Sequence, residues 1–265
     1  MDVIEVLAEA RTSVALGNVA AAIGMSKAGT HRVLNTLCMR GFVVREAGGI
    51  YSLGYKAWEI GCAVPGVALV SRAAPVMQRM ADAVGDGAIL GALDNGFDVV
   101  YLHVIESREA VRVYIDVGAR LPAHVTATGL ACLAWLPPER VMQILPAALP
   151  ARTPETIIDR DALLRELARI RVRGYAQTLG TFRSDVGGVA APIFSADGKA
   201  IAALCVSSPR YRIDAAWKKR MSKAVIAAAN EISGDVLPSR RSRPTAAVSA
   251  SVRARVPRAT RARSD

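Results

Sequence analysis

The chain has 265 residues, of which 52% are hydrophobic and 22% are charged, enough for one large core or two smaller ones. Its formal net charge is +11, and much of that excess lies in residues 239–265, which hold eight arginines and one aspartate. Four scattered cysteines exclude a disulfide scaffold, and the lack of a CxxC pair with only three histidines argues against a zinc site. The acidic N-terminus excludes a signal peptide, and the lack of a long uncharged apolar run excludes a membrane helix. We therefore expect a cytoplasmic protein with no metal, cofactor or membrane partner.

Residues 1–54 are predicted to fold as three helices followed by a hairpin. Apolar residues share one face of a first helix that ends before residues 11–13. A short second helix stops at Gly24, a residue suited to the left-handed position after a helix. Ser26 can cap a third helix over residues 26–40, and Gly41 ends it. Two alternating strands, Phe42–Arg45 and Ile50–Leu53, then flank a glycine-containing turn.

The third helix is predicted to read DNA. Its periodicity turns residues 33, 34, 37 and 38 inward, and this turns Arg32 and Asn35 outward. Arginine and asparagine are the side chains that contact guanine and adenine edges in the major groove, and the second helix of a helix-turn-helix presents them there. The alternative is an exposed helix with ordinary solvated charges. The predicted DNA-contacting residues are Ser26, Lys27, Ala28, Thr30, His31, Arg32, Asn35, Thr36, Arg40 and Arg45.

Residues 55–66 are predicted to form a connecting helix and linker with a loop at Pro65-Gly66, and an amphipathic helix continues to about residue 84. Short apolar strands and helices alternate in residues 67–237. The predicted strands are Ala88–Leu93, Val99–Ile105, Val111–Val117, Val189–Phe194 and Ala200–Ser207, and the predicted helices are 126–136, 138–147, 160–173 and 214–237. This order indicates an α+β domain with a largely antiparallel sheet flanked by helices.

A polar site is predicted within this second domain. Residues 121–129 read as a loop that runs into a helix, which Thr126 or Thr128 would cap, and a helix N-terminus favours anions such as carboxylates. Cys205 and Ser207 alternate along an apolar strand and so share one face. The alternative is that the threonines only cap the helix and Cys205 is a small core residue.

Residues 238–265 form a basic tail without aromatic residues, which we expect to be disordered because it cannot bury enough apolar surface. Its arginines would either attract DNA phosphates without sequence preference or serve as a solubilising extension.

Two blocks of motifs resemble the IclR-type family of bacterial transcriptional regulators. The first is "ALGNVAAAIGMSKAGTHRVLNTLCMRGFVVREAGGIYSLG", and the second comprises "VGARLPAHVTATGLACLA", "IRVRGYA" and "VAAPIFSADGKAIAALCVSSP". The resemblance covers roughly residues 2–237. It implies an N-terminal winged helix-turn-helix, a C-terminal GAF-like effector domain, a palindromic operator in double-stranded DNA, and a homodimer or homotetramer. The ligand is not transferable from any relative, and the expected effector, a small organic acid or aromatic acid, follows instead from the predicted helix N-terminus.

The resemblance also implies the positions of an effector pocket. Thr126 and Gly129, from the predicted start of the helix, complete the set. The predicted effector-binding residues are Leu121, Thr126, Ala127, Thr128, Gly129, Val186, Gly188, Cys205 and Ser207. The chain departs from the family at Lys27-Ala28-Gly29, where relatives often have Lys-Ser-Thr, and at Thr181 and Asp185, where many have an acid and a glycine. Residues usual before the first helix are absent, so either that helix is trimmed or the true start lies earlier.

The sequence therefore predicts a DNA-binding regulator controlled by an effector. The first rival is an enzyme fused to a DNA-binding domain, with His124 as a base beside Cys205 or Ser207, but no nucleophile elbow or phosphate-binding loop supports it and we expect no catalytic residue. The second rival is a DNA-packaging protein that acts through the tail.

Overall fold

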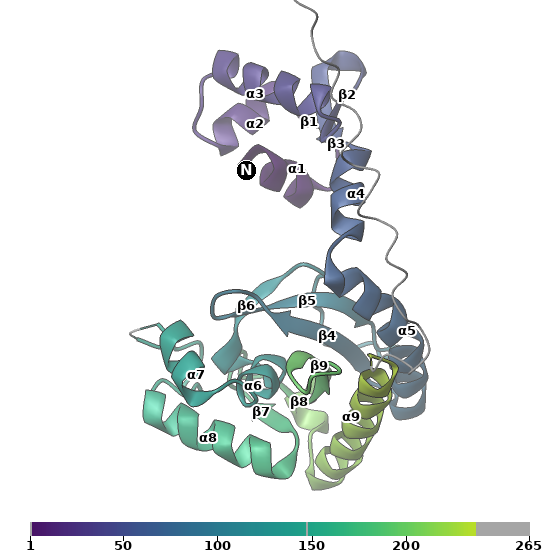
Figure 1. The fold of residues 1–265 in the computed structure, drawn as a ribbon, viewed down its shortest axis with the longest axis vertical. Helices are drawn as coiled ribbons and strands as arrows, with labels where there is room; N and C mark the ends of the chain where they lie inside the picture. Colours follow the sequence, from purple (N-terminus) through teal and green to yellow (C-terminus); the bar gives the residue numbers. More distant parts are fainter. Residues whose placement is uncertain (1, 147, 237–265) are drawn as a thin grey trace, which may run out of the picture.

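The computed structural model describes residues 2–146 and 148–236, so the predicted disorder of the tail lies outside the described residues. Figure 1 shows an N-terminal helical part connected by α4 to a larger part built around a sheet. The predicted α+β class is confirmed, with a helix-turn-helix at the N-terminus and a sheet flanked by helices at the C-terminus.

The N-terminal part packs three helices against a small antiparallel sheet whose strand order is β1-β3-β2. Its elements are α1 (Asp2–Ala10), β1 (Val14–Ala15), α2 (Leu16–Ala22), α3 (Lys27–Met39), β2 (Val43–Arg45) and β3 (Ile50–Leu53). Leu7, Val19, Leu34 and Tyr51 are among the buried side chains that form its core. Gly24 has φ +65°, as its predicted place after a helix requires.

The buried face of α3 differs from the predicted one. Val33 was expected to face inward but is 37% exposed, whereas Thr30 is completely buried. Thr30 lies one turn before Leu34, so both occupy the same face of the helix. The inward stripe is therefore residues 30, 34, 37 and 38, and Val33 lies at its edge.

Two helices connect the parts. They are α4 (Tyr55–Cys62), all of whose residues are exposed or partly exposed, and α5 (Pro65–Val84). The loop predicted at Pro65-Gly66 is wrong, since α5 begins at Pro65, where the missing N–H of proline costs no helical hydrogen bond. No single helix of the described ranges is long and apolar enough to cross a bilayer; α4 and residues 66–84 pass that test only as a pair bent by 77°.

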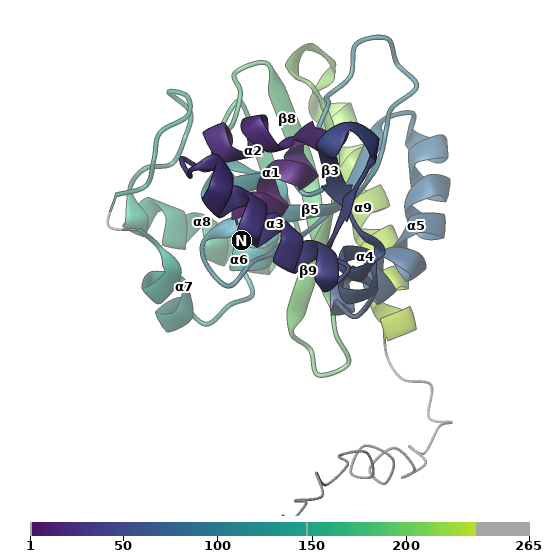
Figure 2. The same ribbon diagram turned by 90° about the horizontal axis from the view of Figure 1, so that it is seen from above.

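The C-terminal part is built on a six-stranded antiparallel sheet in the order β6-β5-β4-β9-β8-β7. Helices α5 and α9 cover one face, and α6, α7 and α8 lie on the other (Figure 2). The remaining elements are β4 (Gly87–Leu93), β5 (Asp98–Ile105), β6 (Arg120–Pro122), α6 (Ala127–Leu133), α7 (Pro138–Ile144), α8 (Arg160–Arg173), β7 (Ala176–Leu179), β8 (Val186–Phe194), β9 (Ala200–Pro209) and α9 (Ala215–Val236).

Strand alternation separates the two faces. Leu204 and Val206 of β9 pack under α5 and α9, whereas Ala203 and Cys205 face α6. Cys205 and Ser207 therefore share the α6 side, as predicted from their spacing.

The strand predicted at Val111–Val117 is wrong. Residues 106–119 form an irregular connection from β5 to β6, and Val111 and Val117 are exposed. The chain rejoins the sheet only at its end, where the Gly118 N–H donates to the Tyr101 carbonyl at 2.7 Å. The short strand β6 that follows was not predicted, and neither was β7.

Candidate functional site

The exposed side of α3 and the adjacent hairpin form the first candidate site. Ser26 caps α3 as predicted: its Oγ accepts from the Gly29 N–H at 3.1 Å. Lys27, Ala28, Arg32, Asn35, Thr36 and Arg40 on or beside the helix are exposed, Arg45 is exposed at the end of β2, and His31 is partly exposed. The exposed residues of α3 and of β2 that were predicted from the sequence are therefore all accessible to solvent.

This surface is positively charged. Within the described ranges, Lys27, Arg32, Arg40 and Arg45 pair with no carboxylate. Their charges are therefore available to a polyanion. Asn35 lies 3.4 Å from the His31 ring, which places its amide on the same exposed side.

Thr30 does not belong to this surface. Its side chain is buried, and its hydroxyl donates to the Ser26 carbonyl at 3.0 Å. The prediction that it contacts DNA is therefore corrected: Thr30 secures the first turn of the helix.

The second candidate site is a pocket on the α6 side of the large sheet. It holds about 530 Å³ of space between protein atoms, part of it open to solvent. Seven of the nine residues predicted for an effector lie around it: Thr126, Ala127, Thr128, Val186, Gly188, Cys205 and Ser207. Leu121 and Gly129 do not line it, since Leu121 packs beside the core and Gly129 packs against Ala123.

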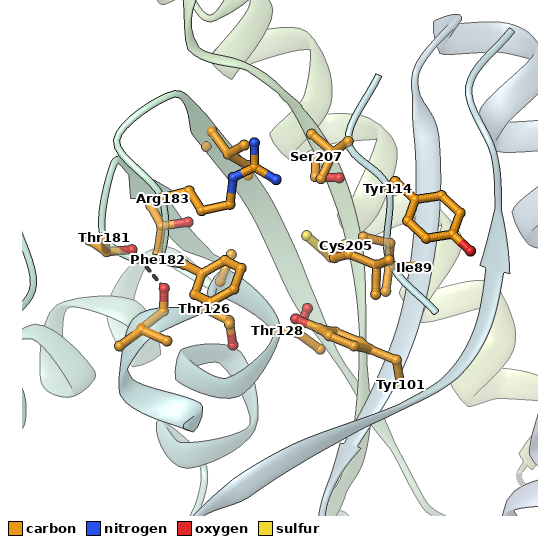
Figure 3. A pocket seen from close by; sticks show the side chains of 18 residues that line it. Ile89, Tyr101, Tyr114, Thr126, Thr128, Thr181, Phe182, Arg183, Cys205 and Ser207 are labelled. Carbon is orange, nitrogen blue, oxygen red and sulfur yellow. Dashed lines mark hydrogen bonds between the residues drawn. The ribbon is translucent and has the colours of Figure 1, made fainter. Parts of the chain in front are cut away.

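Local hydrogen bonds hold the pocket wall in place. Thr126, rather than Thr128, caps α6, its Oγ1 accepting from the Gly129 N–H at 3.0 Å. The Thr181 hydroxyl donates to the Val125 carbonyl at 2.7 Å and so joins the β7–β8 loop to the start of α6 (Figure 3).

Several lining residues were not predicted. Figure 3 shows Phe182 and Arg183 on one side of the pocket and Tyr101 and Tyr114 on the other, with Cys205 and Ser207 between them. Phe182 and Arg183 lie in an irregular loop whose position follows from the tertiary fold, so no periodicity marks them. The conspicuous signal in the sequence was the "TFRSD" stretch between the predicted helix 160–173 and the predicted strand Val189–Phe194, of which only Thr181 and Asp185 were noted.

Arg183 gives the pocket its charge. Of the lining residues, all within the described ranges, it alone carries a formal charge. Its Nε and Nη2 donate to the two carboxylate oxygens of Asp185 at 3.1 and 2.8 Å. These hydrogen bonds raise the pKa of Arg183 and lower that of Asp185, and they leave other guanidinium N–H groups for a second acceptor.

The interior of the pocket is neutral. Burial raises the pKa of Cys205 to about 12 and also raises that of Tyr101, so both keep their protons at neutral pH. A nucleophilic cysteine needs a lowered pKa, and Cys205 has the opposite.

His124 does not join the pocket. Its ring stacks on Phe97, with centroids 5.1 Å apart, and its Nε2 donates to the Pro150 carbonyl at 3.0 Å. Burial lowers its pKa, so the ring is neutral and structural. Groups of three or more potential metal ligands are not found in the described part of the chain.

A helix-turn-helix with a basic outer face, joined to a separate domain with a small-molecule pocket, is the arrangement of a transcriptional regulator. The family described as "IclR helix-turn-helix domain" matches residues 1–47, and "Bacterial transcriptional regulator IclR C-terminal" matches residues 62–234. The chain belongs to the IclR family of bacterial transcriptional regulators, and it carries the family's DNA-binding domain.

Known relatives agree with this assignment. The chain is 33% identical over 241 residues to the HTH-type transcriptional regulator BhcR of Paracoccus denitrificans, and the aligned region covers 90% of this chain and 86% of that protein. It is 35% identical over 191 residues to the regulator KdgR of Escherichia coli, covering 71% and 72%. The relatives are regulators and not enzymes, so the fused-enzyme alternative is rejected.

A solved structure is similar over nearly the whole length. It is an IclR homologue of Microbacterium hydrocarbonoxydans complexed with 4-hydroxybenzoate, with a TM-score of 0.78, 28% identity, and coverage of 90% of this chain and 97% of that one.

Proposed function

We propose that this regulator binds a small organic acid, with aromatic acids as the favoured class, in the pocket between α6 and the sheet. The observation that carries the proposal is Arg183, the one charged residue among the lining residues, all of which the structure describes. A guanidinium makes strong, charge-assisted hydrogen bonds to a carboxylate. Phe182, Tyr101 and Tyr114 supply aromatic surface, and the relative solved with 4-hydroxybenzoate supports an aromatic acid.

We further propose that the effector controls binding to a two-fold symmetric operator. A palindromic operator needs two reading helices, so the working unit is a homodimer or a homotetramer built from dimers. The exposed apolar side chains of α4, with Tyr55 85% and Trp58 71% exposed, support a second copy of this chain as the partner there. An effector acts on operator affinity if it prefers one arrangement of the paired domains. Such a regulator works on chromosomal DNA, so we place it in the bacterial cytoplasm and on the nucleoid when bound.

Binding of a panel of organic acids, with 4-hydroxybenzoate included, tests the ligand class by thermal shift and calorimetry. An acid that binds the folded state raises its melting temperature. Arg183→Gln should weaken acid binding about tenfold or more, because a charge-assisted hydrogen bond contributes about 1.5–3 kcal/mol. The matched amide, 4-hydroxybenzamide, should bind both proteins alike.

Arg169→Gln is the matched control, because Arg169 is exposed and pairs with Glu166 on α8, away from the pocket lining. Equal losses in Arg183→Gln and Arg169→Gln, or no loss in either, would contradict the proposed role of Arg183.

A further inference from the structure

The N-terminal and C-terminal parts contact each other through an ion pair. Arg11 Nη2 donates to Asp116 Oδ1 at 2.9 Å, across 105 residues of sequence. Arg11 follows the last residue of α1, and Asp116 lies in the irregular connection between β5 and β6. Figure 1 shows α1 on the side of the N-terminal part that faces the sheet.

The backbone at Arg11 is unusual. Its φ is +51°, and among the residues that the structure describes it is the one non-glycine residue with a positive φ. This left-handed conformation is unfavourable for residues with a Cβ, and such conformations persist where the surrounding structure holds them. The turn at the end of α1 therefore adopts a strained form at the residue that reaches the other domain.

The same carboxylate oxygen also contacts the pocket wall. The Tyr114 hydroxyl donates to Asp116 Oδ1 at 2.8 Å. The ring of Tyr114 lines the pocket, while Figure 3 shows its hydroxyl directed away from Cys205 and Ser207. The hydrogen bonds from Tyr114 and, to a smaller extent, Arg11 lower the pKa of Asp116, so both contacts are made to an ionised carboxylate.

The segment that carries these residues is free of the sheet. Residues 111–117 have no strand partner within the described part of the chain, and Val113, Tyr114 and Ile115 border the pocket. Surface ion pairs such as Arg11–Asp116 stabilise a fold only weakly, so this one can be exchanged at low cost. One short segment thus forms part of the pocket wall and holds the contact to the DNA-binding domain.

We propose that Tyr114, Asp116 and Arg11 form a relay through which occupation of the pocket changes the position of the N-terminal domain. An aromatic acid that packs on the Tyr114 ring moves or fixes the ring, Asp116 moves with it, and the contact to Arg11 is altered. The relay rests on the proposed function, because the effector enters through that pocket.

Hydrogen exchange of the full-length protein, without any effector, tests the physical connection. Arg11→Ala should raise the exchange rates of the Gly118 and Ala119 amides, which donate to the Tyr101 and Asp116 carbonyls, by threefold or more, although the substitution lies in the other domain. The reversed pair, Arg11→Asp with Asp116→Arg, should restore protection relative to either single change. The control is Arg79→Ala, which breaks a similarly exposed pair between Arg79 and Glu231 within the C-terminal part.

Unchanged exchange at the Gly118 and Ala119 amides of Arg11→Ala would overturn the relay, and so would a reversed pair no better protected than the single variants. A failure of 4-hydroxybenzoate to bind would count only against the proposed ligand, since the exchange experiment contains none.

Asp116→Ala then separates binding from transmission, because Asp116 does not line the pocket and its side chain accepts the hydrogen bonds from both Tyr114 and Arg11. With 4-hydroxybenzoate as the probe, the Kd of this variant should stay within about twofold of the wild-type value. The exchange change that 4-hydroxybenzoate causes around residues 10–15 should disappear. A wild-type response in residues 10–15 of Asp116→Ala would overturn the relay.

Discussion

Gly129 lies so close to Ala123 that a Cβ on it would stand 2.3 Å from the Ala123 carbonyl oxygen and 2.4 Å from the Ala123 Cα. The contact is between backbones, so neither partner can move a flexible side chain aside. It holds the first turn of α6 against the loop that precedes the pocket, and it explains why a glycine occurs beside the Thr126 cap.

Gly129→Ala should therefore destabilise the protein by about 1–3 kcal/mol, the usual cost of overpacking a tight contact. Thermal unfolding measures the change. Gly234→Ala is the matched control, because Gly234 lies on the exposed side of α9 and a Cβ added there would meet nothing within 4 Å. The control should gain up to about 1 kcal/mol from better helix propensity. Equal stabilities for the two variants would show that the close contact does not constrain α6.

Arg32→Ala should reduce affinity for a selected operator by about 1–3 kcal/mol and relax the preference at one base position. The reason is that Arg32 is exposed on the outer face of α3 with no carboxylate partner among the described residues. Selection from a random duplex library with each variant measures both effects. Lys27→Ala, at the start of the helix, should instead weaken all sequences alike and lower the salt slope by about one. An unchanged base preference in Arg32→Ala would contradict the assignment.

Trp58→Asp should weaken the proposed dimer, because it places a charge on the exposed apolar face of α4. Sedimentation velocity at micromolar concentration measures the oligomeric state. Trp58→Phe keeps an aromatic side chain and should retain assembly. If Trp58→Asp sediments like the wild type, the partner surface lies elsewhere.

Removal of residues 239–265 should lower DNA affinity and the salt slope without changing the chosen operator, since its arginines would contact phosphates only. Titrations over a range of salt concentrations compare the full and shortened chains. Equal slopes would favour the alternative of a solubilising extension.

Periodicity in the sequence was sufficient where an element is long or regularly amphipathic. Helix α8 was predicted with the bounds that the structure has, and the hairpin of β2 and β3 was placed to within a residue. The edge of a helical stripe was harder, because on a helical wheel Thr30 is a neighbour of Leu34 and Val33 is equally a neighbour of Leu37, so either could belong to the inward face. Only the packed structure shows that Thr30 is buried and Val33 exposed.

The structure of short apolar runs and the positions of loops could not be predicted from the sequence. Val111–Val117 alternates like a strand, yet no neighbouring strand pairs with it in the described part of the chain, and pairing is decided by tertiary structure. Phe182 and Arg183 reach the pocket because the β7–β8 loop folds over it, which no local pattern encodes. The family resemblance supplied lining residues such as Thr128 and Cys205, and the structure added Phe182 and Arg183.

Operator binding with and without effector tests the central claim most directly. The measurement is fluorescence anisotropy of a selected operator duplex at one fixed salt concentration, titrated with the wild-type protein and with Arg183→Gln. The acid that gives the largest thermal shift should change the operator affinity of the wild type by about 5-fold or more, the range of typical allosteric coupling, and should leave Arg183→Gln nearly unaffected. An acid that binds the wild-type pocket but leaves its operator affinity unchanged would contradict the account.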